Sequence, residues 1–151
     1  MSVLFTALGQ LKEGKIAEAE GKFAKKIAVR NKQALDRQAK AELAASNIAE
    51  RRAARQEKIT KASQIAQFGK SGGQIAGSSL AFLVDTASQF SIEKNLILRT
   101  GLIRSRELRE RGQIELAKGR WARTLGIEAK KLSYIKAGGT ILSGFEKREK
   151  G

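Results

Sequence analysis

The chain contains no cysteine, no proline and no histidine. Without cysteine it forms no disulfide and offers neither a thiolate nucleophile nor a thiolate zinc ligand. Without histidine it lacks the side chain most often used as an acid or base near neutral pH. These absences argue against an enzyme, so we expect no catalytic residues, no metal site and no cofactor. The absence of proline over 151 residues favours long uninterrupted helices, because proline breaks a helix interior.

Large apolar side chains are also scarce. Aromatic residues make up 5% of the chain, and alanine is the usual small apolar residue. Such a composition suits helices packed along their length better than a compact core of large side chains. No apolar run approaches the ~20 residues of a clear membrane span. The first ten residues lack the basic start and cleavage site of a signal peptide, so we expect none.

Basic residues outnumber acidic ones by thirty to fifteen, which gives a formal net charge of +15. This excess favours anionic partners such as nucleic acid, anionic lipid or an acidic protein. A solvated helix with lopsided charge is the plain alternative.

Three parts follow one another along the chain. Residues 3–68 are rich in Ala, Lys, Glu, Gln and Arg and predict one long helix. Residues 69–79 hold four glycines and predict a turn, with Ser78 or Ser79 as the N-cap of the next helix. A second helix is expected over 80–137, where Gly138 and Gly139 would end it. Residues 138–151 would then form a short basic tail.

Two long helices around one short break predict an all-α antiparallel hairpin, covering 1–137, with arms of up to ~90 Å at ~1.5 Å per residue. Such a hairpin has little interior of its own. We therefore expect a coiled-coil homo-oligomer or packing against other chains.

Glycines recur at seven-residue intervals inside both predicted helices, at Gly14 and Gly21 and at Gly112, Gly119 and Gly126. Each costs roughly 1 kcal/mol relative to alanine in a helix interior, so the repeat suggests a groove that receives another helix. A chance repeat is the alternative in a chain with fifteen glycines. A turn centred near residue 74 would place three large residues opposite glycines: Phe23 opposite Gly126, Arg30 opposite Gly119 and Arg37 opposite Gly112.

The predicted turn leads into an uncharged apolar segment. Between Ser71 and Ile92 the only charged residue is Asp85. Apolar residues at a hairpin tip are far from any core that the arms could make, so we expect them to meet a partner or lipid. The candidate tip residues are Ile75, Leu80, Phe82, Leu83 and Val84.

Arg104, Arg111 and Lys118 also repeat every seven residues and are candidate contacts for DNA phosphates. No zinc finger or aromatic platform accompanies them, so such contacts would be independent of sequence. A solvated face with internal Glu–Arg pairs is the alternative. The Gly-Lys-Ser at residues 69–71 lacks the first glycine of a phosphate-binding loop, because position 64 is glutamine.

Three short segments resemble a known family. They are residues 73–86 (GQIAGSSLAFLVDT), residues 103–126, and residues 138–144 (GGTILSG). Together with the long first helix, they resemble the internal virion, or ejection, proteins of podophages, in particular the smallest internal core protein of T7-like phages. The resemblance spans about residues 15 to 145.

The resemblance implies a role in genome delivery. Proteins of this family are packaged in the virion interior near the portal, together with larger core proteins. They leave with the DNA and help to build a conduit through the host envelope, with the smallest placed at the outer membrane. The expected partners are copies of the chain, portal, tail or larger core proteins, DNA and the host outer membrane. A basic helical nucleic-acid-binding or packaging protein is the competing interpretation.

Overall fold

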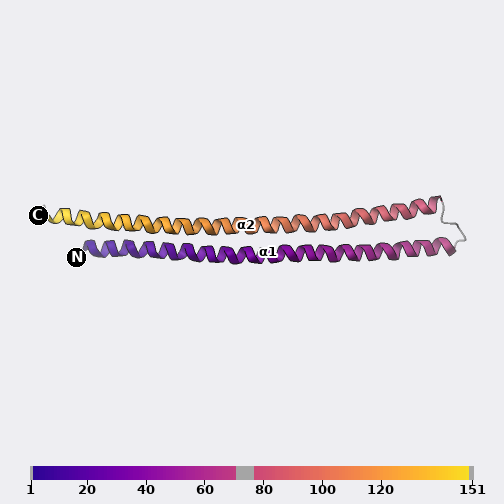
Figure 1. Cartoon of the computed structure of the whole chain (residues 1–151), viewed down its shortest axis with the longest axis horizontal. Helices are drawn as coiled ribbons and strands as arrows, with labels where there is room; N and C mark the ends of the chain where they lie inside the picture. The colour runs from indigo at the N-terminus through magenta and orange to yellow at the C-terminus, as the bar shows by residue number, and fades with distance from the viewer. Residues whose placement is uncertain (1, 71–76, 150–151) are drawn as a thin grey trace. The chain divides into compact units, whose positions relative to one another are not determined.

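The computed structural model describes the backbone of residues 2–70 and 77–149, and the side chains of residues 5–70 and 77–142. Two helices, α1 (Ser2–Lys70) and α2 (Ser78–Glu149), account for nearly all of it. They pack antiparallel as a hairpin (Figure 1). The described ranges contain no strand, so the predicted all-α hairpin is confirmed.

The break between the helices lies within the predicted turn. Its last residue, Gly77, has a φ of 63°, a left-handed conformation that glycine adopts without strain. The Ala81 amide donates to the Gly77 carbonyl oxygen at 3.1 Å, which makes Gly77 the N-cap residue of α2. The cap therefore falls one residue before the predicted serines, which occupy the first helical positions.

The second helix does not end near Ala137 as expected. It continues through Gly138 and Gly139 to Glu149, so residues 138–149 do not form a separate tail. A glycine ends a helix when it adopts a left-handed conformation, and Gly77 is the only described residue with positive φ. In a right-handed conformation, Gly138 and Gly139 weaken the helix without stopping it.

The chain divides into two compact units. The terminal unit consists of Met1–Leu35 and Glu110–Gly151, and the tip unit is Asp36–Arg109. Each unit contains a stretch of α1 packed against a stretch of α2, and we refer to the line of contact within each unit as its seam.

Small residues fill both seams. In the terminal unit the buried residues are Ala7, Gly14, Gly21 and Ala28 on α1, and Gly112, Gly119, Gly126, Ser133 and Ala137 on α2. In the tip unit they are Ala39 and Ser46 on α1, and Thr86, Gly101 and Ser105 on α2. Among the described side chains, no large apolar one is fully buried. The helices thus meet through backbone and short side chains, which permits close approach.

Candidate assembly surfaces

Two of the predicted packing glycines lie directly against the backbone of the opposite helix. A Cβ atom at Gly126 would stand 2.5 Å from the Ala17 carbonyl oxygen, and one at Gly21 would stand 2.7 Å from the Ala122 carbonyl oxygen. Backbone atoms cannot turn aside as a flexible side chain can. Only glycine fits these two positions at this separation of the helices.

The other predicted glycines face side chains. A Cβ at Gly119 would collide with the Ala28 methyl group, and one at Gly14 with the Ser133 hydroxyl group. Gly112 has more room, because the nearest atom, Lys32 Cγ, lies 3.3 Å from the ideal Cβ position. All five glycines lie in the seam of the terminal unit.

The tip unit has an equivalent glycine, Gly101, that the seven-residue spacing does not predict. A Cβ at Gly101 would collide with the Ser46 side chain. Gly101 precedes Gly112 by eleven residues, so a search for seven-residue intervals does not find it. An eleven-residue interval is the other spacing that keeps positions on one helix face, and it would have pointed to Gly101.

The predicted pairing register is wrong by about one helical turn. Gly126 faces Ala17 and Glu18, where Phe23 was expected. Gly119 likewise faces Ala28 and the backbone of Lys25 instead of Arg30. At Gly126 and Gly119 the observed partners are alanine or backbone atoms, because the close approach leaves no room for Phe or Arg there. At Gly112, the expected Arg37 is replaced by Lys32 and Leu35.

Hydroxyl groups in the seams are satisfied locally. Ser46 Oγ donates to the Leu43 carbonyl oxygen at 2.9 Å, and Ser133 Oγ donates to the Lys130 carbonyl oxygen at 2.7 Å. Thr86 Oγ1 donates to a carbonyl of its own helix and accepts from Gln64 Nε2 at 3.1 Å. Serine and threonine can therefore occupy buried seam positions without leaving these hydroxyl donors unpaired.

One glutamate in each unit joins the two helices. In the terminal unit, Glu18 forms salt bridges with Lys22 of its own helix and Lys130 of α2, both at 2.7 Å. Its hydrogen bonds to Lys130 and then Lys22 lower the pKa of the carboxyl group to about 2, and the same contact raises the pKa of Lys130. Glu18 thereby links the arms while remaining ionised across a wide pH range.

Glu57 occupies the corresponding role in the tip unit. It binds Lys61 at 2.6 Å and Lys94 of α2 at 2.8 Å. Hydrogen bonds to Lys61 and Lys94, in that order of size, lower its pKa to about 2. Both glutamates therefore use one oxygen within α1 and the other across the seam.

The predicted tip residues begin α2. Leu80, Phe82 and Val84 are exposed, with 59% of Val84 accessible, and Leu83 is half-buried. Ile75 lies outside the described residues. Asp85 is exposed and accepts a hydrogen bond from Gln89 Nε2 at 2.9 Å. The chain itself therefore leaves the described apolar residues of the tip largely open.

The three predicted phosphate contacts do not share one unit. Arg104 belongs to the tip unit, where it lines a shallow hollow with Ser46 and Gly101. Arg111 and Lys118 belong to the terminal unit. Lys118 forms a salt bridge with Glu115 at 2.8 Å, and that contact lowers the pKa of Glu115. The ion pair of Lys118 with Glu115 thus favours the alternative interpretation, a solvated face with internal ion pairs, over a contact to DNA phosphate.

The contacts across the terminal seam show which residues share a side of the hairpin. Glu18 and Lys130, which form a salt bridge, each stand four residues after a seam glycine, Gly14 or Gly126. In antiparallel helices, residues at the same offset from the seam lie on the same side of the pair.

A second contact follows the same rule on the other side. Asn31 stands three residues after Ala28, Glu115 stands three after Gly112, and the Asn31 side chain interacts with the Glu115 carboxyl group. In the terminal unit, seam residues recur every seven positions along each helix. Residues that stand two, three or six positions after a seam residue of this series therefore lie on one side of the unit. Residues that stand one, four or five positions after such a seam residue lie on the opposite side.

Among the described side chains of the terminal unit, most exposed large apolar ones lie on the first side, and we call it the apolar side. Trp121 is 66% exposed there and Ile135 is 71% exposed. Its exposed apolar residues are Ile16, Phe23, Ile27, Ile114, Trp121, Leu125, Leu132, Ile135 and Leu142. Three further exposed residues, Phe5, Leu8 and Tyr134, lie on the opposite side. On α2 the apolar residues follow intervals of seven, four and three, as in a coiled-coil seam.

Charges on the apolar side are balanced. Its described residues include four acidic ones, Glu13, Glu20, Glu115 and Glu128, and four basic ones, Arg30, Arg111, Lys118 and Lys136.

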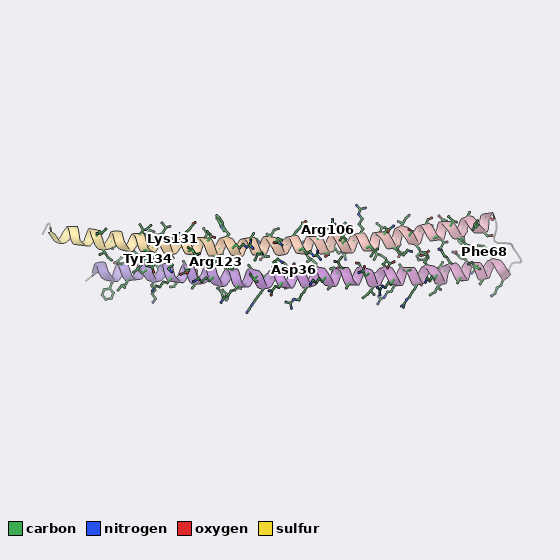
Figure 2. The ribbon with its side chains drawn as sticks, viewed as in Figure 1. Asp36, Phe68, Arg106, Arg123, Lys131 and Tyr134 are labelled. Carbon is green, nitrogen blue, oxygen red and sulfur yellow. The ribbon has the colours of Figure 1, made fainter. Side chains whose placement is uncertain are left out.

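The opposite side has a large positive excess, and we call it the basic side. Its described residues include two acidic ones, Glu18 and Glu110. Its ten basic residues are Lys12, Lys15, Lys22, Lys25, Lys26, Lys32, Arg120, Arg123, Lys130 and Lys131. Arg123, Lys131 and the neighbouring Tyr134 are labelled on α2 in Figure 2. The whole charge excess of the described terminal unit therefore lies on one side.

Within the described ranges, neither helix contains a segment apolar and long enough to span a bilayer. The same ranges contain no group of three or more side chains able to hold a metal ion. Comparisons with protein families, curated proteins and solved structures find no match to the chain.

Proposed function

We propose that the chain is a non-enzymatic assembly protein whose hairpins pack against one another through their exposed apolar residues. The observation that supports this most directly is the division of side chains in the terminal unit. Alanine, glycine and serine fill the seam, while Trp121 and Phe23 remain open to solvent. Burying each large apolar side chain is worth roughly 1.5–3 kcal/mol. A hairpin in which no described large apolar side chain is fully buried has much of this stabilisation still to gain.

A second copy of the chain fits the apolar side better than an anionic surface does. Four acidic residues on that side would be repelled by anionic lipid, whereas they can pair with the four basic residues of a facing copy. The coiled-coil intervals on α2 also match another helix. We therefore assign homo-oligomerisation to this side.

We propose that the chain is an internal virion, or ejection, protein of a tailed phage, and that its homo-oligomer acts in this role. The resemblance of residues 73–86, 103–126 and 138–144 to podophage proteins supports this role, as does a long hairpin without a core of its own. In this role the chain lies in the virion interior beside the portal, tail or larger core proteins. After ejection it contributes to a conduit through the host envelope, and the exposed Leu80, Phe82 and Val84 meet a partner or the outer membrane.

The test uses particles of the virus that encodes the chain. Quantitative mass spectrometry would compare filled particles with particles emptied by receptor-triggered ejection. We expect the chain in filled particles at a fixed copy number and its loss from emptied ones. A chain absent from filled particles, or retained in full after ejection, would contradict the proposed role.

The positive excess of the basic side favours a second candidate, a nucleic-acid-binding or packaging protein. Its hairpins would act as monomers or dimers. Sedimentation velocity distinguishes the two, because an ejection conduit requires higher oligomers.

A further inference from the structure

We infer that the basic side of the terminal unit binds the phosphate backbone of duplex DNA without regard to sequence. The inference rests on the hairpin geometry and is independent of the phage assignment. The basic side differs from the surface that the repeat of Arg104, Arg111 and Lys118 predicts. Arg104 lies in the tip unit, and Arg111 and Lys118 lie on the apolar side of the terminal unit.

Basic residues far outnumber acidic ones on the basic side. Ten basic residues and two acidic residues share the basic side, and one of the two, Glu18, already binds Lys22 and Lys130. Lys12, Lys15, Lys26 and Lys131 are exposed. A concentration of cations on one side, with balanced charge on the other, orients the protein toward a polyanion.

The arrangement of these cations fits a straight polyanion. Lys12 and Lys26 are fourteen residues apart on α1, which corresponds to ~21 Å along the helix. On α2, Arg120 and Lys131 also lie on the basic side and are eleven residues apart, which corresponds to ~16 Å along the helix. Duplex DNA carries about one negative charge per 1.7 Å of its axis, so phosphates are available along the full length of both rows.

Single-stranded nucleic acid fits less well. Its binding surfaces stack successive bases on aromatic side chains. On the described basic side, Phe5 lies at the start of α1 and Tyr134 lies beneath Lys130, whose Nζ is 6.0 Å from the ring centre. Two separated aromatic residues make no stacking platform, so contacts to the backbone of a duplex remain.

The test measures binding of the full chain to a fluorescent 30-base-pair duplex by anisotropy, over a range of salt concentrations. One variant removes three exposed cations of the basic side, Lys15→Gln, Lys26→Gln and Lys131→Gln. The control removes three exposed cations of the apolar side, Arg30→Gln, Lys118→Gln and Lys136→Gln. Both lose the same formal charge.

We expect the basic-side variant to bind DNA at least about tenfold more weakly at 0.1 M salt. The plot of the logarithm of its binding constant against the logarithm of the salt concentration should be less steep by about two to three. The control should stay within about twofold of the unmodified chain. Changing the DNA sequence should have no effect. A further variant, Lys15→Arg, Lys26→Arg and Lys131→Arg, should bind as the unmodified chain does, which separates the effect of charge from that of any change in folding.

Equal losses in both variants would overturn the inference, because net charge alone would then decide binding. Unchanged binding in both would also overturn it. Vesicles containing phosphatidylglycerol serve as the second probe. Binding to vesicles through the three basic-side lysines, without binding to DNA, would assign this side to a membrane surface instead. None of these outcomes bears on whether the chain occurs in virus particles.

Discussion

Gly126 of α2 faces the backbone of Ala17 of α1 so closely that an ideal Cβ would lie 2.5 Å from the Ala17 carbonyl oxygen. Both residues belong to the terminal unit. The contact explains why glycine recurs along a helix that would otherwise gain roughly 1 kcal/mol from alanine at each such position.

Replacing Gly126 with alanine should therefore separate the arms. We expect a loss of about 1–3 kcal/mol in the free energy of unfolding, because the helices must move apart to admit the methyl group. Gly138→Ala is the matched control, since no atom lies within 4 Å of its ideal Cβ position. It should stabilise α2 by up to about 1 kcal/mol. Thermal melts followed by circular dichroism would show opposite shifts, and a stabilised Gly126→Ala would contradict the close seam.

Gly119→Leu should harm assembly more than a substitution in solvent does. The Ala28 methyl group already occupies the space that the new side chain needs. Helix propensity alone predicts the opposite, because leucine is a far better helix former than glycine. Sedimentation velocity of the variant, beside Gly139→Leu as the control in open space, decides between these expectations.

The apolar side should control self-association. Trp121→Glu with Leu125→Glu places two charges among exposed apolar residues, and we expect at least about a tenfold weaker association constant. Lys15→Gln with Lys131→Gln changes the net charge by the same amount at exposed positions of the basic side and should leave the oligomer intact. Sedimentation velocity over a range of protein concentrations measures both. If the two variants dissociate equally, the interface lies elsewhere.

The tip should act in the particle and leave the fold unchanged. Leu83→Asp with Val84→Asp should preserve the helical content, because the first buried seam residue of α2, Thr86, follows both positions. Incorporation or DNA delivery should nevertheless fail. Ser88→Asp with Ser91→Asp adds equal charge one to two turns further along α2 and serves as the control. The measurements are the protein content and infectivity of the particles. Normal values for the first variant would reduce the tip to a connector.

Acid should weaken the hairpin through Glu18 and Glu57. Both have a folded-state pKa of about 2, below the usual 4.5, because lysines of both helices bind their ionised forms. The stability that these contacts give is therefore present above about pH 4.5 and is lost as the pH falls toward 2. Melting temperatures between pH 6 and pH 2 should fall, and the combined variant Glu18→Gln and Glu57→Gln should fall less steeply. An equally steep decline would show that other carboxyl groups are responsible.

The sequence by itself determined the helices and the place where they separate. Good helix formers without proline continue from residue 2 to residue 70, and the glycines of residues 69–77 fix the break. These are local effects, set by backbone freedom and propensity. The seven-residue repeat at Gly112, Gly119 and Gly126 was also legible, because one helix face can be read from spacing alone.

Only the tertiary structure decided what each face meets. The register depends on how closely two helices approach, and that distance follows from the pairing of Gly126 with Ala17 in place of Phe23. The continuation of α2 past Gly138 likewise depends on a backbone conformation that glycine permits but does not impose. The separation of apolar and basic sides emerges when two helices are paired in register, because each side combines residues from both. The charges and spacings along the sequence do not specify the register in which the two helices pair.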